Sequence, residues 1–426
     1  MTRNQKYFQV SNLFEIIAGI LHWIYQHKHF SFFNGNQYDL PYDPFKTFAA
    51  AGSVKTMIPD SIDPFTDLKK FYDVHNDWII GQLNYDLKNN LENLTSNNND
   101  RLNSDLMHFF VPETLIFIQQ QGILISTVHD PGKIFDEIAS FQIPAHVESL
   151  LHIECDTLKK EYIDAVRSIK RQIINGDFYE LNYCMEFFAK VKNINHANIY
   201  QQLNKISPMP FSVFMGLDGQ YIISASPERF LKKTGRNIIA QPMKGTMKRD
   251  ADPVADDKLK QKLRHSEKEI AENMMIVDLM RNDLAKSAEP GSIMVPEMFE
   301  IYSYNHVHQM ISTVTARLRP DVHPVDAIRN AFPMGSMTGA PKIRVMEAIE
   351  HYEKSKRGIF SGSTGYITPE GDFDFNVLIR SIFYSKKTGY LKFSAGSAIT
   401  YDADPEYEYH ECILKTRSMR EALGIS

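Results

Sequence analysis

Apolar side chains recur along this chain at two spacings, one typical of helices and the other of strands. Four apolar residues follow one another at steps of three or four before a glycine: Tyr162, Val166, Ile169, Ile173, and then Gly176. This spacing predicts an amphipathic helix that ends at the glycine. The same reasoning predicts helices at about 266–286, 341–354 and 405–423, and strands at 221–231, 236–242, 308–318, 359–367, 373–385 and 390–400.

The ratio of strands to helices indicates the fold class. Several long strands per helix, at spacings typical of hairpins, favour an α+β fold with large antiparallel sheets over a doubly wound parallel sheet. Residues 1–150 hold no dense cluster of chemically useful side chains, whereas 155–426 hold several. We therefore expect an N-terminal subdomain over the first range and a catalytic domain over the second.

Composition and charge exclude several classes of protein. The 426 residues are 43% hydrophobic and 23% charged, as in ordinary globular proteins. The formal net charge of -5 argues against partners that are recognised by bulk positive charge, such as nucleic acid or anionic membranes. Residues 12–26 are strongly apolar but carry Glu15 and His22 and are too short to cross a bilayer. Three widely spaced cysteines indicate no disulfide framework, which fits a reducing cytoplasm.

Two predicted helices each carry a pair of glutamates three residues apart. Glu269 and Glu272 lie in one helix; Glu408 and Glu411 lie in the other, with Lys415 one turn further on. Residues three apart share a helix face, and we place an apolar stripe of Ile270, Met274 and Val277 opposite the first pair. If the helices converge, these oxygens suit Mg²⁺, which takes one or two carboxylates and keeps several waters. The alternative is that each pair is simply a solvated face.

A glycine-rich turn precedes another predicted helix, in "FPMGSMTGAPKIRVMEAIE" (332–350). Pro341 suits the first helical position, and Gly335 and Gly339 leave backbone N–H groups open at the positive end of the helix. That arrangement binds an anionic group, or is merely a tight turn. The spacing does not match a nucleotide P-loop. We expect the helix to bury Ile343, Met346 and Ile349.

Three charged residues stand in otherwise apolar or turn segments. Arg380 interrupts the apolar run "NVLIRSIFY", so we expect it to point inward and to meet a carboxylate. Glu228 follows Ser226–Pro227 at a strand bend, and Lys244 lies in the turn "QPMKGT". Carboxylates, one lysine, one arginine and glycine-rich backbone together suit a small dianionic substrate bound through a metal.

In this order, the segments resemble the chorismate-utilising enzyme family. The matching segments span about residues 160–423 and are "SASPERFL", "QPMKGT", "EKEIAENMMIVDLMRNDLAK", "FPMGSMTGAPKIRVMEAIE", "GSTGYI", "DFNVLIRS", "SAGSAI" and "PEYEYHECILK". The resemblance implies two interleaved subdomains of antiparallel sheets packed between helices. It also implies that 155–426 is the chorismate-binding domain.

The resemblance assigns roles to individual residues. It implies Mg²⁺ held by Glu272 and Glu411, with Glu269 and Glu408 supporting the metal waters. Glu228 would be the general acid that helps the C4 hydroxyl to leave. The positions that would contact chorismate are Thr246, Thr338, Gly339, Tyr366, Arg380, Gly396, Ser397 and Lys415.

Two positions bear on which reaction the family resemblance implies. Water-using members carry a lysine base and ammonia-using members a glutamine where this chain has Glu180. Lys244 matches the members that aminate C4, in which a lysine first attacks C2 and is then displaced by ammonia, so that one difficult step becomes two easier ones. Two departures stand out: Gln309 where ammonia users have histidine, and Ala398 where the family has a second glycine. His308, one residue away on a strand, should face the other way.

The sequence therefore predicts amination of chorismate to 4-amino-4-deoxychorismate, on the path to p-aminobenzoate and folate. The resemblance implies Mg²⁺ as cofactor and a separate glutamine amidotransferase subunit as the source of ammonia. Formation of anthranilate and a non-catalytic subunit remain the alternatives.

Overall fold

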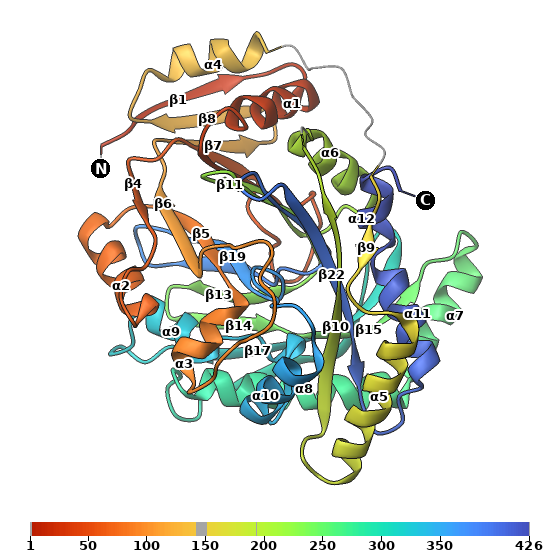
Figure 1. The fold of residues 1–426 in the computed structure, drawn as a ribbon. Coiled ribbons are helices and arrows are strands. Elements are labelled where there is room, and N and C mark those ends of the chain that lie inside the picture. The colour runs from red at the N-terminus through yellow and green to blue at the C-terminus, as the bar shows by residue number, and fades with distance from the viewer. Residues whose placement is uncertain (1, 142–150, 193, 426) are drawn as a thin grey trace.

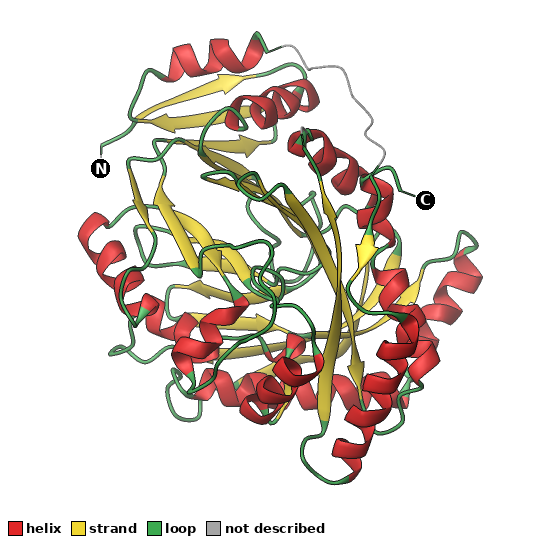
Figure 2. Ribbon diagram, viewed as in Figure 1, coloured by secondary structure: helices red, strands yellow, loops and turns green. Residues whose placement is uncertain are grey.

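Two large antiparallel β-sheets form the centre of the molecule in the computed structural model, which describes residues 2–141, 151–192 and 194–425. Helices lie around the outside of the two sheets (Figures 1 and 2). The predicted α+β class with large antiparallel sheets is confirmed.

The first sheet contains strands from both halves of the chain. Its order is β1-β8-β7-β3-β2-β11-β12-β21-β22-β10-β18, and β9 pairs with β10. The strands are β1 (Asn4–Gln9), β2 (His29–Asn34), β3 (Phe48–Ala51), β7 (Thr114–Gln119), β8 (Gly122–Thr127), β9 (Glu154–Cys155), β10 (Glu180–Lys190), β11 (Phe211–Leu217), β12 (Gln220–Ser226), β18 (Gly339–Ala340), β21 (Ser381–Ser385) and β22 (Tyr390–Ile399).

The second sheet also mixes early and late strands. Its order is β15-β17-β14-β13-β20-β19-β5-β6-β4, and β16 pairs with β17. The strands are β4 (Lys55–Met57), β5 (Ile79–Leu83), β6 (Met107–Val111), β13 (Arg229–Thr234), β14 (Asn237–Gln241), β15 (Met243–Lys248), β16 (Met294–Ser303), β17 (Val307–Arg317), β19 (Ser363–Ile367) and β20 (Phe373–Asn376).

The N-terminal and C-terminal segments share both sheets. In the first sheet β2 pairs with β11 from Asn34↔Ser212 to His29↔Leu217, and in the second β5 pairs with β19. The core between the sheets contains side chains of both, among them Phe33 and Met215 of the first and Ile80 and Phe375 of the second. The segments on either side of the predicted boundary are thus interleaved, and the boundary, between 150 and 155, directly follows residues 142–150, which lie outside the described residues.

Helices cover the outer faces of both sheets. They are α1 (Leu13–Ile24), α2 (Pro64–His75), α3 (Lys88–Leu91), α4 (Pro131–Ala139), α5 (Lys159–Ile174), α6 (His196–Ile206), α7 (Pro253–Arg264), α8 (Glu267–Ala285), α9 (Pro324–Ala331), α10 (Lys342–Tyr352), α11 (Pro405–Lys415) and α12 (Arg417–Ala422), with short 3₁₀ turns η1 (Tyr85–Leu87) and η2 (Gly335–Met337). Helix α8 packs on β15 and β17, and α11 on β22 beside α5 (Figure 1). In the described ranges no helix combines the length and apolarity needed to cross a membrane.

Two segments predicted as single strands each divide between the sheets. Residues 221–231 become β12 and β13, and residues 373–385 become β20 and β21. Pro227 lacks an N–H to continue the first ladder. Arg380 has φ +52°, a left-handed conformation outside the strand region. The apolar pattern runs across both breaks because the strands on either side are buried, so hydrophobicity does not reveal them.

The apolar stripes predicted for two helices are partly wrong. Met274 of α8 is 39% exposed, and Glu272 and Asn273 lie on the buried side in its place. Ile343 of α10 is 48% exposed, while Val345 is buried beside Met346 and Ile349 as part of the same face. In both helices the buried side is rotated relative to the prediction, because polar groups of α8 face the interior and the first turn of α10 projects from the protein.

Candidate active site

Lys244 joins the two sheets at the centre of the candidate site. It is the second residue of β15, and its Nζ lies 2.5 Å from Glu180 Oε1 at the start of β10. Its side chain is 10% exposed and that of Glu180 is fully buried. Lys244 is therefore an interior amine and not a solvated loop charge.

The surroundings of Lys244 favour its charged form. Burial alone would lower its pKa, but Glu180, Glu272 and Glu228 outweigh burial and hold the pKa above its usual value. The amine is protonated in the resting protein. Any reaction in which Lys244 acts as a nucleophile needs a group that removes this proton.

Glu228 lies where the chain passes from β12 in the first sheet to β13 in the second. Its backbone is held at this crossing: Ser226 Oγ donates to the Val377 carbonyl, and Val377 N–H donates to the Glu228 carbonyl. Burial raises the pKa of Glu228 to about 7, although a hydrogen bond with Ser336 and the charge of Lys244 pull it down. A carboxyl group that keeps its proton near neutral pH can act as a general acid.

The two helices with paired glutamates converge, as the cation-site prediction requires. Lys268 Nζ lies 3.3 Å from Glu408 Oε1 on α11 and 3.8 Å from Glu272 Oε1 on its own helix. Burial raises the pKa of Glu272 to about 8 and that of Glu408 above its usual value. The like charges of Glu180 and Glu269 add to the shift at Glu272. The predicted alternative of two solvated faces is wrong, since Glu272 is 6% and Glu408 1% exposed.

These carboxylates fit a hard divalent cation. Among the described residues, Glu272 Oε1 is buried without a hydrogen-bond partner. Burial, with the negative charge of Glu411 adding to it, raises the pKa of Glu269 above its usual value. Glu411 keeps a pKa below its usual range because Lys415 outweighs its burial. Within the described residues no three acidic, imidazole or thiol side chains are already arranged as ligands. Mg²⁺ needs only one or two direct carboxylates and retains its waters, so the chemistry of this cluster, with Glu272 and Glu411 as direct ligands, would be compatible with such an ion.

Arg380 and Lys415 place two cationic side chains near Glu411. Lys415 Nζ lies 2.5 Å from Glu411 Oε1 and 3.0 Å from the Gly396 carbonyl, and Arg380 Nη1 donates to the Lys415 carbonyl. In the described part of the chain no carboxylate lies within ion-pair distance of Arg380. A half-buried guanidinium without a carboxylate partner is suited to an anionic ligand.

Three small residues that were predicted to contact the substrate, Gly396, Ser397 and Thr338, have structural roles. A Cβ on Gly396 would lie 2.3 Å from Cys184 Sγ, so glycine lets β22 approach β10 closely. The hydroxyl of Ser397 is buried against Tyr162 Oη at 2.8 Å. Thr338 Oγ1 donates to the carbonyls of Met334 and Gly335 and fixes the glycine-rich turn. Gly396 and Ser397 thus lie beside Lys415, while Thr338 supports the turn from within.

Gly339 brings the glycine-rich turn against Glu180. It has φ +141°, and a Cβ there would lie 2.1 Å from the Glu180 carbonyl. The pairing of β18 with β10, Glu180↔Ala340 and Leu181↔Gly339, depends on this close approach. The glycine-rich turn therefore helps to hold Glu180 in place through the pairing of β18 with β10.

The neighbours of Thr246 explain one departure from the family pattern. Thr246 Oγ1 donates to Gln309 Oε1, and Gln309 Nε2 donates to the Gly245 carbonyl. His308 points to the other side of the strand, where its ring contacts Asp256 and Ser303. The prediction that His308 faces away is confirmed, and Gln309 fixes the turn that carries Lys244.

Tyr366 is not brought together with this group. Its ring packs against Phe33, Phe45, Phe48 and Trp78 in the core between the sheets. Burial raises its pKa well above the usual value. Tyr366 lies on the same side of the second sheet as the buried Arg229–Asp374 pair, in a region of structural packing.

Sequence reasoning missed three contributors to the site. The ion pair of Glu180 with Lys244 was not predicted, since the two are 64 positions apart. Lys268 was overlooked, although its spacing of four from Glu272 is a helix ion-pair signal. Ser336, the partner of Glu228, lies in a turn that was examined only for backbone N–H groups.

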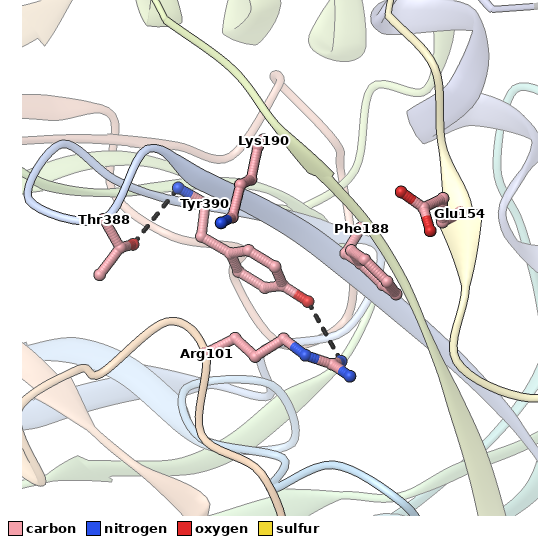
Figure 3. Close-up of a pocket in the computed structure, with 6 residues that line it drawn as sticks. All are labelled: Arg101, Glu154, Phe188, Lys190, Thr388 and Tyr390. Atoms are coloured by element: carbon pink, nitrogen blue, oxygen red, sulfur yellow. Dashed lines mark hydrogen bonds between the residues drawn. The ribbon is translucent and has the colours of Figure 1, made fainter.

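A separate pocket of about 460 Å³ lies at the far end of β10. Figure 3 shows its lining residues: Arg101, Glu154, Phe188, Lys190, Thr388 and Tyr390. Phe188 is eight positions along the strand from Glu180, roughly 26 Å at about 3.3 Å per residue. This pocket is distinct from the site around Lys244.

Comparison with protein families identifies one match over most of the chain. The family described as chorismate binding enzyme matches residues 21–421. Among solved structures, anthranilate synthase component I from Streptococcus pneumoniae superposes with a TM-score of 0.76 at 26% identity, covering 91% of this chain and 94% of that one. The menaquinone-specific isochorismate synthase MenF from Escherichia coli has a TM-score of 0.80 at 15% identity, covering 99% and 94%, and shares the fold.

Curated relatives are similar over a shorter region. Aminodeoxychorismate synthase component 1 from Klebsiella aerogenes is 41% identical over 265 residues, 62% of this chain and 58% of that protein. The chloroplastic aminodeoxychorismate synthase of Arabidopsis thaliana is 40% identical over 271 residues, 63% of this chain and 29% of that protein. The matches thus span between about three tenths and six tenths of the length of these two relatives.

Proposed function

The chain belongs to the chorismate binding enzyme family, and on that basis we propose that it aminates chorismate at C4 to give 4-amino-4-deoxychorismate, the precursor of p-aminobenzoate in folate synthesis. The observation that carries the proposal is the buried Lys244 within one cluster with Glu228 and two pairs of glutamates. Several relatives at about 40% identity bear the name aminodeoxychorismate synthase.

The cluster offers the groups that a two-step amination needs. Lys244 would attack C2, the ring diene electrons would shift towards C4, and the C4–O bond would break. Glu228, with a pKa of about 7, can supply the proton that converts the hydroxyl into water. Ammonia then adds at C4 and Lys244 leaves C2, so a single difficult displacement is divided into two allylic ones.

The remaining charges would bind the substrate. Arg380 and Lys415 present cations to one carboxylate, and the cluster of glutamates presents oxygens to a divalent metal. Mg²⁺ held by Glu272 and Glu411, with Glu269 and Glu408 around its waters, would supply a positive charge for the substrate's other carboxylate. Lys268, which now partly neutralises Glu272 and Glu408, would share them with the metal.

The nitrogen would come from a glutamine amidotransferase subunit or from free ammonia. The component 1 naming of the Klebsiella relative fits a separate partner of this kind. Since ammonia itself is the nucleophile at C4, the chain alone should react when ammonium is supplied.

Product analysis tests the proposal. The chain is incubated with chorismate, MgCl₂ and ammonium at mildly alkaline pH, and the product is identified by mass. We expect aminodeoxychorismate, which keeps the enolpyruvyl group. The variant Lys244→Ala should give no such product while it still binds chorismate in equilibrium dialysis. Normal turnover by Lys244→Ala would exclude the covalent route.

Anthranilate formation is the second candidate, because the structural relative from Streptococcus pneumoniae is an anthranilate synthase component I that covers 91% of this chain. Anthranilate lacks the enolpyruvyl group, so the same mass analysis distinguishes the two reactions. A chain that gives no product with any supply of ammonia would be the non-catalytic subunit.

A further inference from the structure

We infer that Glu180 is the base that removes the proton from Lys244 before the amine attacks, and that it returns this proton when the lysine leaves. The inference rests on the proposed covalent role of Lys244 and adds a second catalytic residue to it. It follows from the contacts, burial and charges around the pair.

The first observation is contact. Glu180 Oε1 lies 2.5 Å from Lys244 Nζ, a hydrogen bond through which a proton can pass directly. Across the described residues it is the one hydrogen bond formed by this Nζ. The other acidic groups act on Lys244 through space: Glu228 before β13, Glu269 and Glu272 on α8, and Glu411 on α11.

The second observation is how each of these other carboxylates is engaged. Glu228 carries a proton itself near neutral pH, since its pKa is about 7. Glu411 is held by Lys415 at 2.5 Å, and Lys268 lies between Glu272 and Glu408. Among the residues that the structure describes, the side chain of Glu180 therefore has one hydrogen-bond partner, the amine that has to be activated.

The third observation is the environment of the pair. Glu180 is fully buried, and its Oε2 has no hydrogen-bond partner in the described part of the protein. The free lone pairs of this carboxylate are therefore not engaged by any other donor there, and a proton taken from Nζ can rest on them. The remaining carboxylates hold Lys244 in its charged form at rest, so the amine cannot react until this contact carries its proton away.

The fourth observation is the rigid placement of Glu180. It is the first residue of β10, its strand pairs with β18 at Glu180↔Ala340, and Tyr179 N–H donates to the Ala340 carbonyl. Gly339 permits this close approach. A base held on a strand between two neighbours keeps its oxygen on Lys244 throughout the reaction.

The proton balance of the proposed reaction closes with these groups. The N–H bond of Lys244 breaks as an O–H bond forms on Glu180, and the freed lone pair makes the bond to C2. The ring electrons move to C4, and the departing hydroxide takes the proton of Glu228 to become water. When ammonia bonds to C4, Lys244 leaves C2 as a neutral amine and takes its proton back from Glu180. The new ammonium group at C4 gives up one proton, and Glu228 regains the one that it gave to the hydroxide.

The decisive variant is Glu180→Gln, which keeps the shape of the side chain and removes its basicity. The full-length protein is mixed with chorismate and MgCl₂ without ammonia, and the adduct on Lys244 is followed by mass after rapid quenching. We expect adduct formation at pH 7 to slow by about 10²–10⁴-fold, the usual contribution of a general base. The rate should recover as pH rises and solvent removes the proton. Glu180→Asp keeps the carboxylate but shortens the side chain by one methylene, so its rate of adduct formation should fall between those of the wild type and Glu180→Gln.

A purely electrostatic role predicts the opposite. If Glu180 only holds Lys244 in its charged form, Glu180→Gln leaves more neutral amine and forms the adduct at an equal or higher rate, which overturns the inference. A wild-type protein that makes product without any Lys244 adduct overturns the covalent step itself, and the inference with it. The two failures are thus distinguished by the wild-type adduct.

Glu186→Gln is the matched control. Glu186 lies on the same strand, is 5% exposed and pairs with Lys392 at 2.6 Å, so its change also removes one half of a buried ion pair. Glu186 lies six positions from Glu180, away from the site. We expect it to lower the thermal midpoint while leaving the rate of adduct formation within about twofold, whereas Glu180→Gln should change the rate and its pH profile.

Discussion

At the scale of single residues, two carboxyl groups near Lys244 have different surroundings, and we propose opposite roles for them on that basis. Within the ranges that the structure describes, no cation lies within ion-pair distance of Glu228, and burial raises its pKa to about 7. Glu180 touches the ammonium of Lys244 directly. A donor and an acceptor of protons can thus lie on either side of one amine, which is what a substitution of hydroxyl by amine requires.

Glu228→Gln should lower kcat by about 10²–10⁴-fold, because an amide cannot supply the proton for the leaving hydroxyl. The raised pKa gives a second expectation. The acid form of Glu228 is present below about pH 7 and is lost above it, so wild-type kcat/KM should decline as pH rises through this value. The measurement is a pH profile at a constant concentration of free NH₃.

In the Glu228→Gln protein the decline near pH 7 should be absent. Binding of chorismate by equilibrium dialysis controls for loss of substrate affinity. A variant that retains activity within threefold of the wild type would show that another group protonates the hydroxyl.

At the scale of helices and strands, the sequence predicted which elements exist better than it predicted how they end or turn. The E-x-x-E spacing correctly paired Glu269 with Glu272, but hydrophobicity put Met274 inside and implied an acidic outer face. The acidic face of α8 is the buried one, because α11 packs its own glutamates against it and Lys268 of α8 lies between Glu272 and Glu408. Such a meeting of distant helices leaves no trace in the local apolar pattern.

The sequence pattern also did not predict where the chain passes from one sheet to the other. An apolar run looks alike whether it continues in one sheet or passes to the next, so 373–385 was predicted as one strand and is two. Arg380 was expected to point inward and to meet a carboxylate. It is half-buried, no carboxylate of the described residues pairs with it, and its left-handed φ of +52° depends on the tertiary structure. The candidate residues could be named from the sequence, whereas the pairing of Lys244 with Glu180 needs the register of β15 and β10.

Glu272→Gln should stabilise the cation-free protein at alkaline pH. The pKa of Glu272 rises from its ordinary value of 4.5 to about 8 on folding, so the folded state binds the proton more tightly than the unfolded state. The free energy of unfolding of the wild type therefore falls as pH rises from about 4.5 to 8. The Glu272→Gln protein has no titrating carboxyl group there and does not show this fall. We expect a gain of about 1–3 kcal/mol at pH 8.5 and none near pH 4, measured by chemical unfolding.

Added MgCl₂ should reverse this order. The wild type should gain thermal stability through binding to the folded state, and Glu272→Gln should gain much less. Glu421→Gln on the exposed side of α12, where Glu421 pairs with Arg417, is the control and should change neither response. An identical response of the wild type and Glu272→Gln to Mg²⁺ would exclude Glu272 as a ligand.

Gly339→Ala should disturb the site through the backbone. Its φ of +141° strains any side chain, and its Cβ would lie 2.1 Å from the Glu180 carbonyl, so β18 must move from β10. We expect at least a tenfold loss of activity and a loss of more than about 1 kcal/mol in unfolding free energy. Gly291→Ala, with φ +76° and open space around its Cβ, shares the backbone strain without the clash. Equal activity in the two variants would show that the approach of the turn is not needed.

At the scale of the whole molecule, both sheets are built from both ends of the chain. Without residues 1–150, β11 loses β2 and β19 loses β5, so each sheet would be cut through its interior. The core between the sheets would lose Phe33, Phe48 and Ile80 among others. The segment 151–426 holds the candidate site but lacks the packing that supports it.

A chain of residues 151–426 should therefore fail to fold on its own. We expect no cooperative transition in thermal unfolding followed by circular dichroism, and aggregation in size-exclusion chromatography, because two long strand edges are exposed. A chain from residue 10 onwards is the control: it loses only β1, an edge strand with mostly exposed side chains, and should unfold cooperatively. Cooperative unfolding of 151–426 would establish that segment as an independent domain.

The two places where the chain crosses between sheets lie side by side. Ala225 N–H donates to the Arg380 carbonyl and Val377 N–H donates to that of Glu228, so the crossings are bonded to each other. The group that we propose as the acid for the leaving hydroxyl and the group that we propose to face a substrate carboxylate are thus both attached where one layer is joined to the other. Their positions depend on how the two layers pack, so we expect substitutions deep in the shared aromatic core, far from the proposed reacting atoms, to alter turnover.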